Sequence, residues 1–255
     1  MESIFTNVYE SKAWGNNNNI DYNGSSGDGS SIEYNKDTYV FFLKKFITDN
    51  KIKNIIDLGC GDFRCGKLIY DDLDILYTGY DAYKKVIDYN SKNYLLPKYS
   101  FKHLDFCNNK ESIINGDLCI LKDVIQHWAV DNIYTFLDYL VETKKFKYIL
   151  ICNCCNQKQD NTNIIDGDFR HLSCNYFPLK KYNPIKLYNY NSKEVCVITT
   201  EVLTSVSSLS NLLKICGYCK KLCKNLSCSN CKKIYYCDKN CQIAHWTNHK
   251  KECKM

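Results

Sequence analysis

Cysteine and histidine recur in four closely spaced pairs near the C-terminus. Two or three residues separate the members of each pair, which are Cys216 and Cys219, Cys228 and Cys231, Cys237 and Cys241, and His249 and Cys253. Thiolate and imidazole ligands at such separations bind zinc, which takes four ligands in tetrahedral geometry. Residues 215–255 have too little apolar core to bury ordinary cysteines. The spacing therefore predicts two zinc ions, and it leaves open whether the pairs combine sequentially or interleave.

A second group of residues that could bind a ligand or take part in a reaction includes the glycine loop Asp57-Leu58-Gly59-Cys60-Gly61. A dinucleotide-binding loop would need a third glycine where Arg64 stands. A phosphate loop fits the glycine and lysine at positions 61, 66 and 67, but it needs a magnesium-binding hydroxyl where Leu68 stands. Both of these nucleotide-binding interpretations are therefore disfavoured.

Acidic residues recur at intervals that match the ends of the expected strands. Asp57 lies at the end of the first strand, Asp81 at the end of the second and Asp105 at the end of the third. A single aspartate at such a place is commonly a turn former. Three of them at successive strand ends form a pattern typical of nucleoside binding, in which a carboxylate such as Asp81 accepts both ribose hydroxyls.

The elements that must position these residues alternate between short β-rich segments and helical ones. The expected strands are residues 54–58, 76–80, 100–104, 118–121 and 147–152, and residues 131–145 carry apolar side chains at helical spacing. This alternation predicts an α/β fold with a parallel sheet and helices on both faces. Ligands of such sheets bind at the carboxyl ends of the strands, so the loop and the acids are expected to share one site.

The glycine loop and its acids resemble those of the class I S-adenosylmethionine-dependent methyltransferases, which have a Rossmann-like sheet. The resemblance implies that Gly59 and Gly61 let the backbone approach the methionine part of the cofactor, and that Asp57 holds the loop or meets the cofactor's ammonium. It also implies that Asp81 binds the ribose and Asp105 the adenine amino group.

Further motifs are similar to landmarks of a largely uncharacterised branch of these enzymes. They are Trp14-Gly15, Ser26-Gly27-Asp28-Gly29-Ser30-Ser31, Cys60-Gly61-Asp62-Phe63, Lys122-Asp123-Val124 with His127, and Gly167-Asp168-Phe169-Arg170. The chain departs from the branch at Leu58-Gly59, where Ala-Pro is common, and at Phe169, where Trp is common. The second departure affects the expected substrate pocket.

Methyl transfer mainly requires that the acceptor be held in line, with a base where the acceptor arrives protonated. Asp123 and His127 follow the fourth expected strand and are our candidates for the base or for orienting the acceptor. The alternative is that Asp123 caps the next helix and His127 packs on Trp128. Asp168 and Arg170 lie in a later loop that is expected to close over the acceptor or to form a surface ion pair.

The segment YCDKNCQIAHWTNHKKEC, residues 236–253, resembles the MYND zinc finger. The resemblance implies interleaved zinc sites, one formed by Cys216, Cys219, Cys237 and Cys241 and the other by Cys228, Cys231, His249 and Cys253. It leaves Cys223 and His245 as spare residues. MYND fingers generally bind short peptides, so a protein or peptide partner is expected, with Gln242 and Trp246 lining the groove.

The charge of the chain is concentrated in this cysteine-rich tail. From Leu212 onward there are ten lysines, one aspartate and one glutamate, so the tail has a net charge of +8. The rest of the chain has a net charge of −2, which gives +6 for the whole chain. The lysines are dispersed and the tail has no arginine for bidentate base contacts, which argues against a nucleic-acid partner. Long apolar runs and a signal pattern are lacking, so we expect a soluble intracellular protein without a membrane partner.

These observations predict four parts: an N-terminal arm or lid at residues 1–35, a methyltransferase domain at 36–205, a linker helix at 206–214 and a MYND module at 215–255. The expected function is S-adenosylmethionine-dependent methyl transfer to an unidentified acceptor, with two zinc ions in a module that recruits a protein partner. The alternative is a catalytically inactive adaptor that binds proteins through the zinc finger.

Overall fold

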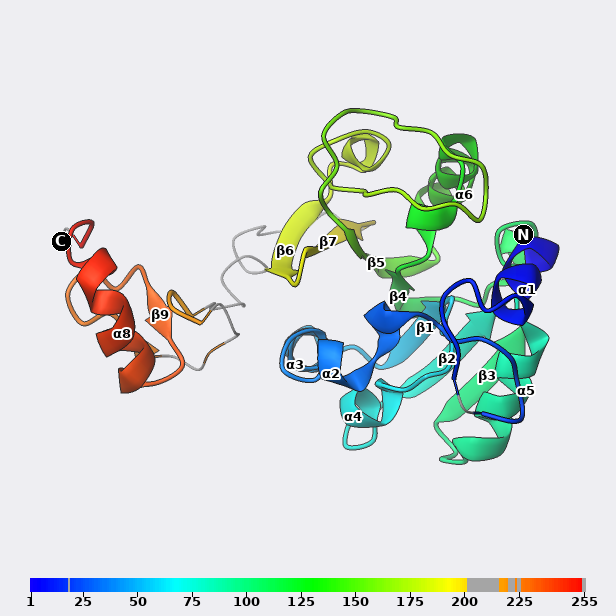
Figure 1. Cartoon of the computed structure of the whole chain (residues 1–255), viewed down its shortest axis with the longest axis horizontal. Helices are drawn as coiled ribbons and strands as arrows, with labels where there is room; N and C mark the ends of the chain where they lie inside the picture. Colours follow the sequence, from blue (N-terminus) through cyan, green and yellow to red (C-terminus); the bar gives the residue numbers. More distant parts are fainter. Residues whose placement is uncertain (18, 201–215, 220–222, 224–225, 254–255) are drawn as a thin grey trace.

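A seven-stranded sheet organises the larger part of the molecule (Figure 1). The structure is a computed structural model that describes residues 1–17, 19–200, 216–219, 223 and 226–253. Its strands are β1 (Asn54–Leu58), β2 (Leu76–Asp81), β3 (Tyr99–His103), β4 (Gly116–Lys122), β5 (Phe146–Cys154), β6 (Ile185–Tyr190) and β7 (Lys193–Thr199). The order across the sheet is β3-β2-β1-β4-β5-β7-β6. The expected linker helix at 206–214 lies outside the described residues.

The first five strands are parallel, as predicted, and the sheet continues into two further strands that the sequence analysis did not place. β7 pairs antiparallel with β5, and β6 pairs antiparallel with β7. Asn191 and Ser192 form the two-residue connection between β6 and β7, and both have positive φ angles, 42° and 65°. Such backbone matches the twist of a tight hairpin. The sequence signal was a two-residue polar break between apolar runs, which we did not interpret as a hairpin.

The helices are α1 (Glu2–Glu10), α2 (Ile32–Asn35), α3 (Tyr39–Asp49), α4 (Gly66–Tyr70), α5 (Lys84–Asn93) and α6 (Val130–Thr143). Short 3-10 turns are η1 (Asp28–Ser30), η2 (Lys110–Ser112), η3 (Ile125–His127) and η4 (Leu179–Tyr182). The C-terminal module contains β8 (Leu226–Ser227), β9 (Tyr235–Tyr236) and α8 (Lys239–His249). Among the described helices, none is both long and apolar enough to cross a membrane.

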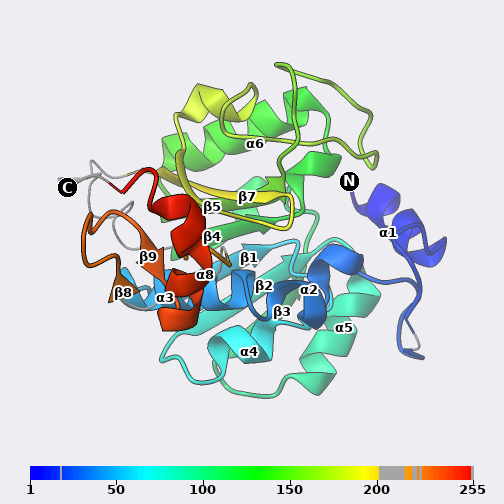
Figure 2. The same cartoon turned by 60° about the vertical axis from the view of Figure 1, so that its left-hand side comes forward.

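Side chains that alternate along the central strands build two separate cores. Leu118 and Ile120 of β4 face α3, whose Phe42 and Phe46 are buried against them. The residues between and after them, Cys119 and Leu121, face α6 and its buried apolar stripe, which is Ile133, Phe136, Leu137 and Leu140. Figure 2 shows α6 on one side of the sheet and α2, α3 and α4 on the other. A sheet covered on both faces is the predicted fold class, and it is confirmed.

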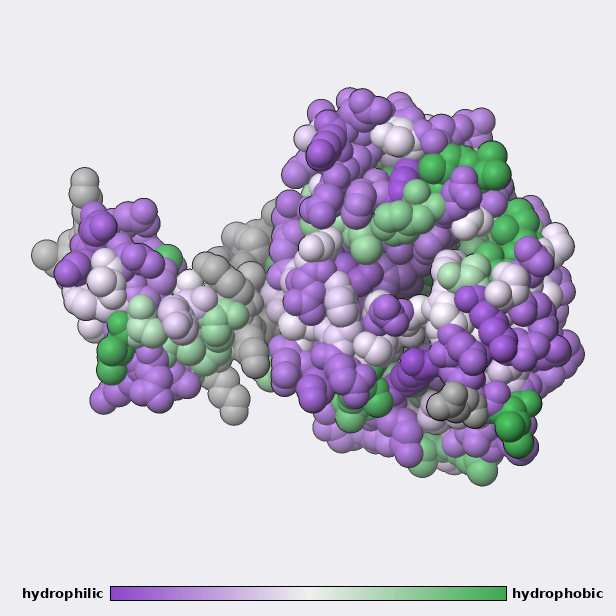
Figure 3. Space-filling view, in the orientation of Figure 1, coloured by the Kyte–Doolittle hydropathy of each residue, from purple (hydrophilic) through white to green (hydrophobic). Residues whose placement is uncertain are grey.

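The visible outer surface is mainly hydrophilic, and its hydrophobic residues lie in small separate patches (Figure 3). Exposed large apolar side chains are dispersed along the chain, for example Ile20, Leu76 and Ile165. Dispersed apolar residues of this kind are normal for a folded domain and do not by themselves mark an interface.

Candidate functional site

A pocket opens at the carboxyl ends of the parallel strands. The sheet order reverses between β1 and β4, and such a switch point is where α/β sheets bind their ligands. The residues predicted to bind the cofactor and the two candidates for the base line this one pocket: Asp57, Gly59, Gly61, Asp81, Asp105, Asp123 and His127. Residues separated by up to 70 positions in sequence are therefore brought together. Asp168 and Arg170, which were expected to close over the acceptor, are not among the described residues that line it.

Two glycines let the loop after β1 form one wall of the pocket. Gly59 and Gly61 have φ angles of +81° and +52°, which favour glycine. A Cβ on Gly59 would lie 2.4 Å from Val124 Cγ2, and one on Gly61 would lie 2.5 Å from Ser26 Oγ. The Gly59 backbone N–H also donates to Tyr80 O at 2.8 Å, which ties the loop to the end of β2. Any side chain at either glycine would displace a neighbouring wall of the pocket.

Asp81 links the glycine loop to the second strand. Its two carboxylate oxygens accept hydrogen bonds from the backbone N–H groups of Tyr83, at 2.9 Å, and Gly61, at 3.0 Å. Burial raises the pKa of Asp81 to about 6, against the lowering effect of these N–H groups, and the nearby charge of Asp62 also raises it. Each oxygen still has a lone pair with which to accept from a ligand hydroxyl.

Asp57 and Asp105 occupy different electrostatic environments in the lining of the pocket. Asp57 accepts a hydrogen bond from Tyr77 Oη at 2.8 Å, and burial raises its pKa to about 6. Burial also acts against the charged form of Asp105, but N–H groups of Glu2 and Asn108, at 3.0 and 2.8 Å, lower its pKa overall. The charged form is therefore more favoured at Asp105 than at Asp57.

Asp123 lies between two lysines rather than at a helix cap. Its carboxylate pairs with Lys122 Nζ at 2.8 Å and with the buried ammonium of Lys193. Burial opposes the charged form, yet the two ammonium groups lower the pKa of Asp123. Its backbone has a positive φ of 61°. A carboxylate held in this way is a weak base. Lys193, on β7, was missed because a single lysine in a strand carries no distinguishing sequence signal.

His127 is held as a neutral imidazole with a defined tautomer. Its Nδ1 lies 2.8 Å from the carbonyl oxygen of Asp168, which can only accept, so Nδ1 carries the proton. Nε2 then presents its lone pair, and the Gln126 amide donates to it at 3.3 Å. Burial lowers the pKa of His127, and the charges of Lys193 and Arg170 lower it further. The imidazole packs on the Trp14 ring at 4.9 Å rather than on Trp128.

The N-terminal segment supplies another wall of the pocket, together with Trp14. Tyr9 stacks on Tyr83 with ring centroids 4.4 Å apart, and its hydroxyl lies 2.8 Å from Ser26 Oγ. Ser26 Oγ in turn accepts the N–H of Asp62 at 2.9 Å. The sequence had singled out the motifs that contain Trp14 and Ser26, whereas the role of Tyr9 was missed.

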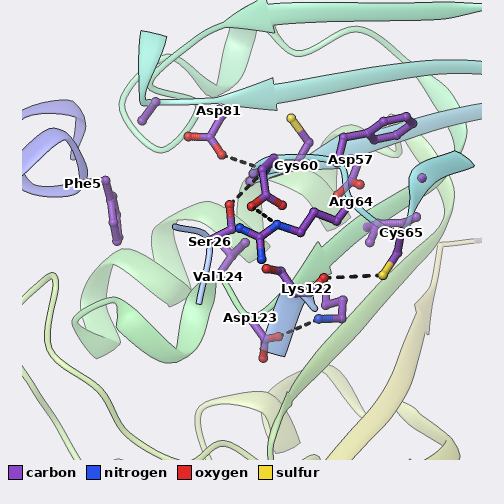
Figure 4. A pocket seen from close by; sticks show the side chains of 18 of the residues that line it. Phe5, Ser26, Asp57, Cys60, Arg64, Cys65, Asp81, Lys122, Asp123 and Val124 are labelled. Atoms are coloured by element: carbon purple, nitrogen blue, oxygen red, sulfur yellow. Dashed lines mark hydrogen bonds and ion pairs between the residues drawn. The ribbon is translucent and has the colours of Figure 1, made fainter. Parts of the chain in front are cut away.

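Arg64 extends across the pocket from the glycine loop. Figure 4 shows its side chain between the Asp81 side and the Asp123 side of the pocket. Its Nε donates to Asp62 at 2.7 Å. Lys67, which a phosphate loop would place on the ligand, is instead exposed at the surface. The exposed position of Lys67 is therefore unlike that of a phosphate-loop lysine.

The C-terminal Cys and His residues gather in two clusters of four. One is Cys216, Cys219, Cys237 and Cys241, and the other is Cys228, Cys231, His249 and Cys253, with the ligand atoms of each cluster within 4.8 Å of one another. The clusters interleave along the chain, as the family resemblance implies. Representative separations are 3.4 Å between Cys219 Sγ and Cys237 Sγ and 3.4 Å between Cys231 Sγ and His249 Nε2. These donor sets fit tetrahedral zinc.

The residues outside the clusters have other contacts. His245 Nδ1 lies 3.2 Å from the Tyr236 hydroxyl. Asp238 caps α8 by accepting the N–H of Cys241 at 2.8 Å. On the same helix Trp246 is 44% exposed and makes a T-shaped contact with the His249 ring. An indole partly open to solvent on a ligand-bearing helix is available to a partner.

Comparison with known families identifies the module. The MYND finger family model matches residues 216–253, so this part of the chain is a MYND zinc finger. Tudor domain-containing protein 1 of Danio rerio is 41% identical over 51 residues, 20% of this chain and 4% of that protein. SET domain and MYND-type zinc finger protein 6 of Schizosaccharomyces pombe is 46% identical over 46 residues, 18% of this chain and 10% of that protein. The matches therefore span only small parts of these relatives.

Solved structures identify the fold of the larger domain. The methyltransferase domain of bacterial CtHen1 superposes with a TM-score of 0.51 at 15% identity, covering 64% of this chain and 97% of that one. An O-methyltransferase family protein from Burkholderia thailandensis superposes with a TM-score of 0.50 at 10% identity, covering 63% of this chain and 55% of that one. The larger domain thus has a Rossmann-like methyltransferase fold, and at these identities the likeness concerns the fold alone.

Proposed function

We propose that this protein transfers a methyl group from S-adenosylmethionine to an acceptor bound beside His127, and that its MYND finger recruits a protein partner. The observation that carries the catalytic part is that the glycine loop, the strand-end acids and His127 line one pocket at the switch point of a methyltransferase-like sheet. An adaptor without activity has no physical need for a pocket with this set of groups.

The pocket fits the cofactor at several independent points. Gly59 and Gly61 form a cradle that a Cβ would fill. The Asp81 carboxylate would accept ribose hydroxyls, and Asp105, whose charged form is favoured, would accept from the adenine amino group. Asp57 and Arg64 would meet the ammonium and the carboxylate of the methionine part. When bound, S-adenosylmethionine supplies an electrophilic methyl group on a sulfonium.

His127 is the group that we assign to proton removal. Its unprotonated Nε2 provides the lone pair, which the Gln126 amide releases when the acceptor binds, and Asp168 fixes the tautomer through Nδ1. Because the pKa of His127 is lowered, the imidazole is neutral at pH 7 without needing another base. Asp123 is held by Lys122 and Lys193, so its role in this proposal is to orient groups at the acceptor side. Trp14 helps to exclude water from His127.

The chain organisation in this proposal keeps the predicted parts. Residues 1–35 act as a lid, since Tyr9, Trp14 and Ser26 line the pocket. Residues 36–205 are the catalytic domain and residues 215–255 the MYND module. The two four-residue clusters bind one zinc ion each, and Gln242 and Trp246 line the peptide groove of α8.

Replacement of Asp81 by asparagine tests the cofactor site. The variant is expected to bind S-adenosylhomocysteine about ten- to a hundredfold more weakly, because charge-assisted hydrogen bonds to the ribose become neutral ones. Since the ionised carboxylate is the better acceptor and its pKa is about 6, affinity in the parent should fall as the pH is lowered from 7 to 5. Calorimetry over this pH range measures both effects.

Asp88→Asn provides the matched control, because Asp88 is an exposed carboxylate that pairs with Lys84 on α5. It should bind the cofactor as the parent does. Folded Asp81→Asn protein with unchanged affinity would contradict the ribose assignment. A parent chain with no measurable cofactor affinity would instead favour the adaptor.

Replacement of Trp246 by alanine tests recruitment. The loss of a rigid, partly exposed aromatic anchor should reduce partner binding by about thirtyfold, which corresponds to about 2 kcal/mol. Zinc content and cofactor affinity should stay unchanged, because the pocket lies in the other domain. Pull-down from a lysate, followed by titration of the captured protein, gives the affinity.

Thr247→Ala is the control for this experiment, because Thr247 is also exposed on α8. Thermal melting of both variants separates loss of the groove from loss of the fold. If folded Trp246→Ala protein retains every partner of the parent, the groove assignment is wrong.

A further inference from the structure

Arginine is used at only two positions among the 34 Lys and Arg residues of this chain, Arg64 and Arg170. Both end the same tetrapeptide, Gly-Asp-Phe-Arg, at residues 61–64 and 167–170. A guanidinium offers a planar fork of donors that an ammonium lacks, so its selective use indicates positions where a fork is needed. Arg64 donates to the aspartate of its own motif, Asp62.

In the described part of the chain, Arg170 has no comparable partner. Its side chain is 5% exposed, and within the described part of the chain its Nε, Nη1 and Nη2 atoms are covered and make no hydrogen bond. The charge of Asp166 acts on it without a hydrogen bond between the two, and the Asp166 oxygens instead accept from the Ala129 N–H and the Asn132 amide, each at 2.7 Å. A buried guanidinium in this state is unfavourable, and an anion of matching geometry would satisfy it.

The segment that carries Arg170 is bound directly to the residues of the pocket. Arg170 N–H donates to Gln126 O at 3.1 Å, and Gly167 N–H donates to His127 O at 2.8 Å. The charge of Arg170 also acts on His127. Phe169, which is half exposed, packs on the His127 ring at 5.9 Å. The unpaired guanidinium therefore belongs to a segment that is bound to the proposed base, and its charge acts on that base, although Arg170 is not among the described residues that line the pocket.

We propose that Arg170 binds an oxyanion, a carboxylate or a phosphate, of the methyl acceptor. The inference rests on the proposed methyl transfer and adds that the acceptor is anionic. Its anionic group is held by the guanidinium fork, and its nucleophilic atom is directed toward His127. Nearby, Asp123 lies between Lys122 and Lys193, which leaves a further net positive charge on this side of the pocket. Access to the covered fork requires the 167–170 segment to shift when the acceptor binds.

The test is thermal melting of the full chain without cofactor, followed by far-ultraviolet circular dichroism. Sodium acetate and sodium phosphate are each compared with sodium chloride at equal ionic strength. When the concentration of the matching anion is about ten times its dissociation constant, the anion should raise the Tm of the parent by roughly 3–5 °C. Arg170→Met should lose this response, and in chloride it should melt higher than the parent because a buried unpaired charge is removed. Phosphate also stabilises proteins generally, so the parent-minus-variant difference is the measured quantity.

Lys181→Gln is the matched control and should keep the anion response, because Lys181 is an exposed cation outside the pocket and is already paired with Asp138. A larger effect of acetate identifies a carboxylate, and a larger effect of phosphate identifies a phosphoryl group. If neither anion gives a parent-minus-variant difference, the proposal is overturned. Should Arg170→Met fail to fold, Arg170→Lys replaces it and is expected to lose most of the shift, since an ammonium has no fork. Because the melting experiment contains no cofactor, its result does not depend on whether the chain transfers methyl groups.

Discussion

Purified chain is expected to contain two zinc ions, and removal of both should unfold the MYND module while the larger domain stays folded. Structural zinc contributes about 10–16 kcal/mol to the folding of small modules, more than any other single change considered for this protein. Without metal, each cluster would hold four ligand atoms within 4.8 Å with little apolar core to keep them together. Elemental analysis, and circular dichroism before and after a strong chelator, measure these outcomes.

Cysteine variants sharpen the zinc experiment. Cys241→Ser should reduce the zinc content to about one ion per chain, since it removes a ligand from one cluster only. Cys223→Ser is the control, because Cys223 lies in the same module but outside both clusters. A folded, unchelated chain with fewer than two zinc ions would refute the two-site assignment. Equal zinc loss in both variants would refute the assigned ligand sets.

Replacement of His127 by glutamine should reduce methyl transfer by about 10²- to 10⁴-fold, the usual contribution of a positioned general base. Cofactor affinity should change by no more than about twofold, because the cofactor contacts come from the glycine loop and the acids. In the parent, the rate should rise with pH through the lowered pKa of His127 and then level off, since the unprotonated imidazole is the active form. This rise should be absent in the variant.

The measurement uses labelled S-adenosylmethionine and the fraction of a cell extract that takes up the label. His103→Gln is the control, because His103 lies at the end of β3 and contacts Ala82 O rather than the acceptor side of the pocket. A His127→Gln protein that transfers methyl groups at the parent rate would show that the acceptor needs no base. In that case His127 would serve only to position the acceptor.

The sequence alone was sufficient for the elements whose physics is local. The five parallel strands were placed within two residues at either end, because each is a short β-rich run and each is followed by a turn or a helix. The zinc ligands were also recognisable from spacing, since two- and three-residue separations place two ligands on one turn. The glycine loop was recognisable because Gly59 and Gly61 adopt backbone conformations that other residues avoid.

The tertiary structure decided which residues of the site act on one another. Asp123 was expected at the acceptor side, but only the hairpin of β6 and β7 brings Lys193 to it and lowers its pKa. The tautomer of His127 likewise depends on Asp168, 41 residues away, and on Gln126. Such contacts are set by how strands and loops pack, which no local pattern records.

The same distinction separates the two arginines. Arg64 and Arg170 end identical tetrapeptides, so the sequence cannot tell which one is paired. In the folded chain Arg64 reaches Asp62, whereas Asp168 gives its carbonyl oxygen to His127, and Arg170 is buried without an acceptor among the residues that the structure describes. Sequence fixes which groups are available, because side-chain chemistry and local backbone preference are properties of single residues. Burial and partners depend on the whole fold, and they decide what charge each group carries and what it can bind.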